Sequence, residues 1–143
     1  MRILFDTSAL VPALVRTHPF HANCRPWLTD SIAGKHEAYI SLHTLAELYS
    51  ALTNMPTTPR IAPSLAVQLA QGAVGPLQTV SLTAEEYLET LEDAATKGVV
   101  GGLVHDAVIA AAARKASVER LLTLNVPHFL LVWPQGRDII CRP

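Results

Sequence analysis

Side chains that could bind a metal ion stand at four places where a strand ends or a helix begins. They are Asp6, Glu47, Asp106 and Asn125. In an open α/β fold the carboxyl ends of parallel strands lie at one edge of the sheet, so side chains from such turns can converge there. Carboxylate and amide oxygens are the ligands that Mg²⁺ and Mn²⁺ prefer. The spacing predicts a divalent-metal site and, with it, a metal-dependent phosphodiesterase, most simply a small nuclease.

Asp6 follows the short apolar run Ile3–Phe5, which is typical of a buried strand. That position is where open α/β sheets place their ligands. An Asp there could instead cap the next helix, although Thr7 and Ser8 could cap it equally well. We therefore favour a functional role for this carboxylate.

Glu47 lies in a predicted helix over residues 42–54, almost opposite the apolar stripe of that helix. It is the one charge on a face of small residues, which would let another element and a metal approach. Thr44 and Glu47 also match the capping box of a helix start, and a lone exposed Glu needs no role. The sequence leaves both interpretations open.

Asp106 stands in the first turn of a predicted helix over residues 103–116, where the helix dipole alone could favour an acid. The stretch 107–113 is apolar on every side, which predicts a helix buried between layers. A carboxylate at the N-terminal end of a buried helix loses hydration and needs a partner of opposite charge, and a metal ion could be that partner. Asn125 follows a predicted strand; it is either a turn residue or a ligand through its amide oxygen.

Alternating strands and helices must position these residues. We expect strands over residues 3–5, 38–40, 77–82, 120–123, 130–133 and 138–141. We expect helices over residues 7–14, 18–30, 42–54, 63–72, 83–98 and 103–116. The alternation predicts one α/β domain over residues 1–143, with a mainly parallel sheet.

The composition is that of a packed chain without a strong charge. Of the 143 residues, 50% are hydrophobic and 16% are charged, and the formal net charge is −1. Binding of nucleic acid would therefore depend on metal ions or on local basic side chains. The scattered basic residues are more typical of a solvated surface than of a binding site; they are Arg16, Arg25, Arg60, Arg114, Lys115 and Arg120.

The same sequence gives no sign of a membrane span or a signal peptide. Asp6 interrupts the first apolar run almost at once, and no apolar stretch is long enough to cross a bilayer. Cys24 and Cys141 are too few for a zinc site. We expect a cytoplasmic protein with reduced thiols and no membrane association.

Four segments together resemble the PIN-domain family and, in size and layout, the VapC-type toxins of prokaryotic toxin–antitoxin pairs. The segments are ILFDTSAL (3–10), LAELYSAL (45–52), GGLVHDAVIAAA (101–112) and LLTLNVPHF (121–129). They cover the chain nearly end to end and in the expected order. The resemblance implies a three-layer α/β/α sandwich of the PIN type.

The resemblance also assigns roles to single residues. The family's acids fall on Asp6, Glu47 and Asp106, and its fourth position, frequently Asp, is Asn125 here. The hydroxyl often found two residues earlier falls on Thr123. The resemblance implies an RNA-cleaving enzyme that uses Mg²⁺ or Mn²⁺, with all five residues in its active site. It also implies a homodimer inhibited by a separate antitoxin.

Two alternatives remain at this point. A haloacid-dehalogenase-type phosphatase also begins with a strand ending in Asp, but it needs a second Asp two residues later, where this chain has Ser8. A non-catalytic interaction module of the same fold would agree with Asn125 in place of an acid. His43, His105 and His128 adjoin the candidate elements without zinc-type spacing, so we expect them to support the site or lie on the surface.

Overall fold

Five strands form the central sheet of the computed structural model, which describes residues 1–143. They are β1 (Arg2–Phe5), β2 (Glu37–Ser41), β3 (Gln78–Val80), β4 (Arg120–Leu122) and β5 (Ile140–Cys141). Their order in the sheet is β3-β2-β1-β4-β5, and every neighbouring pair is parallel. The sheet expected to be mainly parallel is therefore parallel throughout.

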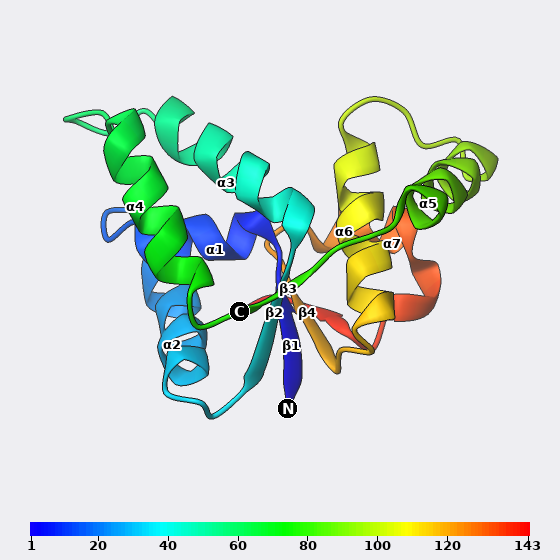
Figure 1. Cartoon of the computed structure of the whole chain (residues 1–143), viewed down its shortest axis with the longest axis horizontal. Coiled ribbons are helices and arrows are strands. Elements are labelled where there is room, and N and C mark those ends of the chain that lie inside the picture. Colours follow the sequence, from blue (N-terminus) through cyan, green and yellow to red (C-terminus); the bar gives the residue numbers. More distant parts are fainter.

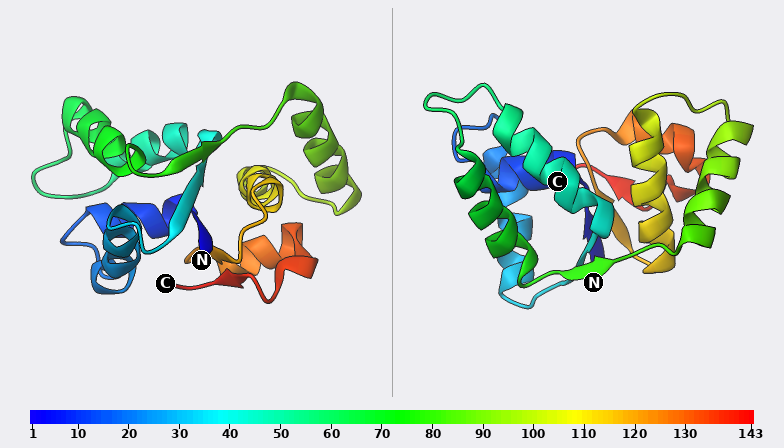
Figure 2. Two further views of the ribbon diagram at one scale, coloured as in Figure 1. Left: turned by 60° about the horizontal axis from the view of Figure 1, so that its bottom comes forward. Right: turned by 45° about the horizontal axis from the view of Figure 1, so that its top comes forward.

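Helices cover both faces of the sheet, as Figure 1 shows with the strands viewed nearly edge-on. One layer contains α1 (Thr7–Leu14), α2 (His21–Ile32), α3 (Leu42–Asn54) and α4 (Pro63–Val74). The other contains α5 (Ala84–Thr96), α6 (Leu103–Lys115) and α7 (Val126–Val132). The two turned views in Figure 2 show the same separation, which confirms the three-layer α/β/α arrangement.

Each face of the sheet has its own apolar core. Successive side chains of a strand point to opposite faces, so Ile3 and Phe5 of β1 pack on the α1–α4 side and Leu4 packs on the α5–α7 side. All three side chains are fully buried. This burial on both faces explains why β1 is a continuous apolar run rather than an alternating one.

The order of the strands fixes where a site can form. The chain adds β2 and β3 on one side of β1 and then returns to place β4 on the other side. At such a switch point the connections leave in opposite directions and open a crevice outside the carboxyl ends of the strands. Asp6 follows β1, Thr123 follows β4, and the amide of Asp6 donates to the carbonyl of Leu122 at 3.0 Å.

One expected strand is wrong. Leu130–Trp133 belongs mainly to helix α7, which begins after Asn125 with Pro127 in its first turn. A short apolar run does not by itself distinguish a strand from a buried helix. Here Phe129 and Val132 are buried three residues apart, and Leu131 between them is exposed, which is a helical spacing.

Other differences are small. The second helix begins at His21 rather than near His18, and the third strand is shorter than expected. The spacing of Leu45, Leu48, Tyr49 and Leu52 predicts an apolar stripe on α3, but Tyr49 is exposed. Cys24 and Cys141 are free thiols. No helix has both the length and the apolar character needed to cross a membrane.

The burial of side chains within α7 predicts that two neighbouring substitutions differ in their effect on stability. Phe129→Ala should lower the free energy of unfolding by about 3–5 kcal/mol, because a fully buried ring leaves a cavity. Leu131→Ala should change it by less than about 0.5 kcal/mol, because that side chain is 61% exposed. Urea denaturation of both variants measures the contrast, and equal losses would show that the segment is not this helix.

Candidate active site

Asp6 is the buried anchor of the site, with 3% of its surface exposed. Its Oδ2 accepts hydrogen bonds from the Ser8 amide at 3.3 Å, from the Ser8 hydroxyl at 2.5 Å and from the Thr123 hydroxyl at 2.8 Å. Asp6 therefore caps α1 itself, and the expectation that Thr7 or Ser8 could do so is wrong. Oδ1 accepts none of these three bonds.

The two hydroxyls that meet Asp6 have fixed orientations. The Leu124 amide donates to Ser8 Oγ at 2.8 Å, and the Asn125 amide donates to Thr123 Oγ1 at 2.9 Å. Each hydroxyl has a single proton, and each directs it to the carboxylate. The backbone after β4 thus orients the hydroxyls, and the hydroxyls orient Asp6. The sequence predicts a role for Thr123 in the site but indicates Ser8 only as a possible helix cap.

Glu47 approaches from α3. This helix begins at Leu42 with Ser41 as its N-cap, so Thr44 lies inside the helix and the capping-box interpretation of Glu47 is wrong. Glu47 Oε2 instead accepts a hydrogen bond from Thr7 Oγ1 at 3.2 Å. The Thr7 hydroxyl, one residue after Asp6, therefore holds the end of Glu47 beside the switch point.

Asp106 approaches from the opposite layer, in the first turn of α6 as expected. The preceding Gly101 has a φ of +61°, which a residue with a side chain rarely adopts, and this turn leads the chain into the helix. Residues 107–113 are all buried, so α6 is fixed in place. Asp106 Oδ2 lies 3.4 Å from Nδ1 of His128 on α7.

The three carboxylates are desolvated and repel one another. Burial raises the pKa of Glu47 to about 7, and the charge on Asp6 adds to the shift. Burial and then the charge on Asp6 raise the pKa of Asp106 to about 6, against an opposing effect of His128. Burial also raises the pKa of Asp6, although the Ser8 and Thr123 hydrogen bonds oppose it. A nearby cation would relieve both the desolvation and the repulsion.

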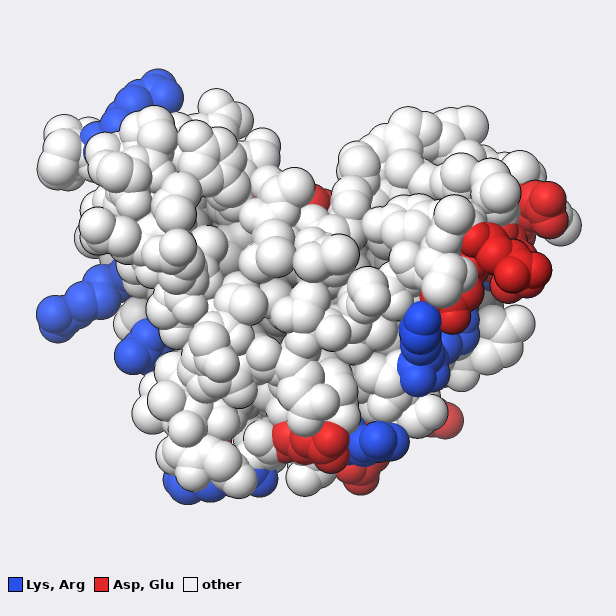
Figure 3. Space-filling model, in the orientation of Figure 1, with Lys and Arg blue, Asp and Glu red and all other residues white.

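A cleft of about 1110 Å³ joins these groups, and its lining includes Asp6, Glu47, Asp106 and Asn125. Figure 3 shows the surface hollowed between α3 and α6, with acidic atoms at the bottom of the hollow. The Asn125 side chain makes no hydrogen bond that caps α7, so its amide is free to meet a ligand. Arg142 is the one Lys or Arg in the lining.

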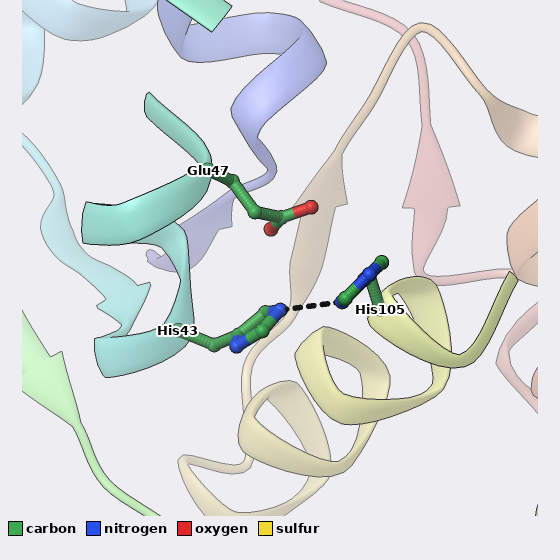
Figure 4. Close-up of side chains that lie close together, drawn as sticks. All are labelled: His43, Glu47 and His105. Atoms are coloured by element: carbon green, nitrogen blue, oxygen red, sulfur yellow. Dashed lines mark hydrogen bonds between the residues drawn. The ribbon is translucent and has the colours of Figure 1, made fainter. Parts of the chain in front are cut away.

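A histidine pair that the sequence did not predict also lines the cleft. Nε2 of His43 on α3 lies 2.8 Å from Nδ1 of His105 on α6 (Figure 4). The rings are stacked, with centroids 4.9 Å apart. The signal in the sequence is that His43 is four residues before Glu47 and His105 is adjacent to Asp106.

The PIN-domain family model matches residues 3–126, which is most of the chain. The chain belongs to the PIN-domain family. It is also 38% identical over 115 residues to Ribonuclease VapC27 of Mycobacterium tuberculosis, covering 80% of this chain and 78% of that protein. Family membership and Ser8 at the second position after Asp6 remove the haloacid-dehalogenase alternative.

Two solved structures share the PIN fold over most of both chains. The VapBC2 structure of Rickettsia felis, bound to a promoter DNA fragment, matches with a TM-score of 0.67 at 20% identity, covering 100% of this chain and 99% of that one. VapC20 of Mycobacterium tuberculosis, described as a toxin that cleaves the sarcin–ricin loop, matches with a TM-score of 0.68 at 19% identity. The latter match covers 88% of this chain and 92% of VapC20.

The raised pKa values of Glu47 and Asp106 predict that the metal-free protein is more stable in mild acid than in mild alkali. A carboxyl group whose pKa is higher in the folded chain takes up protons on folding, so stability falls as pH rises from about 4 to 7. After allowance for solvent, the free energy of unfolding should fall by about 1–3 kcal/mol between mild acid and mild alkali. Urea denaturation in EDTA measures this profile.

A pair of variants isolates the contribution of the cleft. Glu47→Gln should flatten the pH profile and raise stability in mild alkali, because it removes one of the repelling charges. Glu92→Gln removes an exposed carboxylate from α5 and should leave the profile unchanged. If Glu47→Gln keeps the wild-type pH dependence, burial and the neighbouring charges do not raise the pKa of Glu47 as described.

Proposed function

We propose that this chain is a Mg²⁺- or Mn²⁺-dependent endoribonuclease, the toxin of a toxin–antitoxin pair. The observation that supports this most strongly is the meeting of three desolvated carboxylates, from three different elements, at the switch point of the sheet. The 38% identity to Ribonuclease VapC27 supports RNA as the substrate.

The donor set fits a hard divalent cation. Asp6, Glu47 and Asp106 would hold the ion through carboxylate oxygens, and Asn125 would add an amide oxygen. The negative charge of the three carboxylates would offset the charge of one such ion fully, or of two such ions in part. When bound, a divalent ion polarises the phosphate and lowers the pKa of the attacking water.

The side chains around this donor set would do the remaining work. Ser8 and Thr123 hold Asp6 in one orientation, and Thr7 does the same for Glu47. Such preorganisation lowers the reorganisation needed when charge develops on the reacting phosphate. Arg142, in the lining of the cleft, would pair with an RNA phosphate. Because other basic side chains lie elsewhere, substrate charge would be balanced mainly inside the cleft.

The partners are part of the same proposal. VapBC2, in the Rickettsia felis structure, is similar in fold to this chain, and this similarity supports a separate antitoxin as partner. Large apolar side chains on the α5–α7 side are exposed, including Leu88, Val100 and Leu131. Exposed apolar side chains are typical of protein interfaces. They support a homodimer, an antitoxin contact, or both.

A non-catalytic PIN module remains the second candidate because Asn125 stands where the family frequently has an acid. The cleft retains the three other acids, and the buried Thr123 hydroxyl still holds Asp6 in place. A module without turnover has no need for this desolvated cluster, so we favour the enzyme. Measurement of RNA cleavage with and without divalent metal separates the two.

Removal of a charge from the cluster should abolish cleavage. Asp6→Asn, Asp106→Asn and Glu47→Gln keep side-chain shape but each delete one ligand charge, and each should lower the rate by at least about 100-fold. EDTA should stop the wild type, and Mg²⁺ or Mn²⁺ should restore it. A gel assay on a mixed RNA pool with purified proteins measures these rates.

Glu92→Gln, on exposed α5, is the matched control and should cleave at the wild-type rate. Circular dichroism should show folded protein for every variant, with or without EDTA, because the apolar cores do not depend on metal. Wild-type rates in Asp106→Asn, or cleavage that persists in excess EDTA, would overturn the metal mechanism.

Asn125→Asp tests whether position 125 meets the ion. An added charge at about 4 Å and an effective dielectric of about 20 is worth about 4 kcal/mol, and solvent at this exposed position reduces that value. We expect Mn²⁺ affinity to rise by about tenfold or more, or a second site to appear, since 1.4 kcal/mol is a tenfold change. Calorimetry reports both quantities; unchanged affinity and stoichiometry would leave Asn125 as a turn residue only.

A further inference from the structure

His43, Glu47 and His105 place three ligand atoms of mixed type at the side of the acidic cleft. The three atoms all lie within 4.8 Å of one another. His43 and Glu47 are four residues apart and project from the same face of α3, whereas His105 comes from the first turn of α6. In Figure 4 the three side chains point toward one another across the gap between the two helices.

The two imidazoles already place one nitrogen each at a shared point between α3 and α6. At 2.8 Å between Nε2 of His43 and Nδ1 of His105, one nitrogen must offer a lone pair to a proton on the other. A metal ion can replace the shared proton and accept a lone pair from each ring.

The third ligand is close enough to join them. Metal–ligand distances of about 2.0–2.2 Å place two ligand atoms on one ion about 3–3.5 Å apart. The two nitrogens are already near this separation, and the Glu47 carboxylate would reach it by a small side-chain rotation. The one hydrogen bond that holds Glu47 comes from Thr7, at 3.2 Å.

We propose that His43, Glu47 and His105 form a binding site for a transition-metal ion of the Zn²⁺ class. Imidazole nitrogens favour Zn²⁺, Ni²⁺ and Cu²⁺, whereas Mg²⁺ favours oxygen ligands alone. The site therefore differs in chemistry from the oxygen cluster of Asp6 and Asp106. Two imidazoles and one carboxylate leave a fourth position for water, as in open zinc sites.

Sharing of Glu47 gives this site a regulatory consequence, which rests on the proposed ribonuclease function. An ion held by the two histidines draws the Glu47 carboxylate away from the oxygen cluster. The oxygen cluster is then left with two carboxylates instead of three. Zn²⁺ should therefore inhibit cleavage supported by Mg²⁺, by withdrawing a ligand rather than by blocking the cleft.

Calorimetry with Zn²⁺ alone, added to the metal-free full chain without RNA, tests the site itself. We expect one site in the wild type. The Zn²⁺ affinity should fall by at least about 10- to 100-fold in His43→Asn and in His105→Asn, because removal of even a hydrogen-bond partner of a metal ligand lowers affinity by this much. Co²⁺ gives a visible absorption spectrum that reports nitrogen ligands, and this spectrum should be lost in the same variants.

His128→Asn is the matched control, because His128 is the other imidazole beside the acidic cluster, 3.4 Å from Asp106. Zn²⁺ binding should survive this substitution and should also survive Asp106→Asn. The proposal is overturned if Zn²⁺ affinity is unchanged in both His43→Asn and His105→Asn, or if it is lost in His128→Asn instead. Thermal denaturation of each variant checks that the pair has not been lost through unfolding.

Cleavage assays then test the consequence separately. In the presence of Mg²⁺, Zn²⁺ should inhibit the wild type, and His43→Asn should need at least about tenfold more Zn²⁺ for half-inhibition of its own zinc-free rate. Zn²⁺ binding without any ribonuclease activity would leave the metal site intact and remove only the proposed function. Zn²⁺ binding at these residues with no effect on an active enzyme would overturn the inhibition.

Discussion

The burial of the Asp6 carboxylate at the carboxyl end of β1 is the constraint on which the rest of the site depends. A carboxylate with 3% exposure is costly unless its oxygens are satisfied. The neighbouring strand supplies the Thr123 hydroxyl, and the backbone after it fixes both Thr123 and Ser8. Parallel pairing of β1 with β4 is thus what makes the buried charge tolerable.

Carboxylates from both helical layers share the desolvation of Asp6. Glu47 from α3 and Asp106 from α6 are themselves partly buried, and burial first and the charge on Asp6 second raise their pKa values to about 7 and about 6. Isolated carboxylates in this state lower the stability of the fold. A divalent ion would turn three unfavourable charges into ligands, so the same geometry that costs stability favours metal binding.

Much of this arrangement could be predicted from the sequence, because each acid stands at a boundary that apolar patterning makes visible. The buried run before Asp6 and the all-apolar stretch after Asp106 locate two of them. Patterning could not distinguish helix from strand for Leu130–Trp133, since four apolar residues fit either. Nor could it show that Ser41 rather than Thr44 caps α3, because both residue types are good caps and stand close together in the sequence. The contact between His43 and His105 was also out of reach, because it joins two elements far apart in the sequence.

The central claim is that the cleft holds a divalent ion through these carboxylates. Anomalous diffraction from crystals soaked in Mn²⁺ would test it most directly, because the signal locates the ion without reference to activity. The account predicts an anomalous peak within about 2.0–2.3 Å of carboxylate oxygens of Asp6 and Asp106. A peak elsewhere, with none at these two carboxylates in soaked crystals, would contradict it.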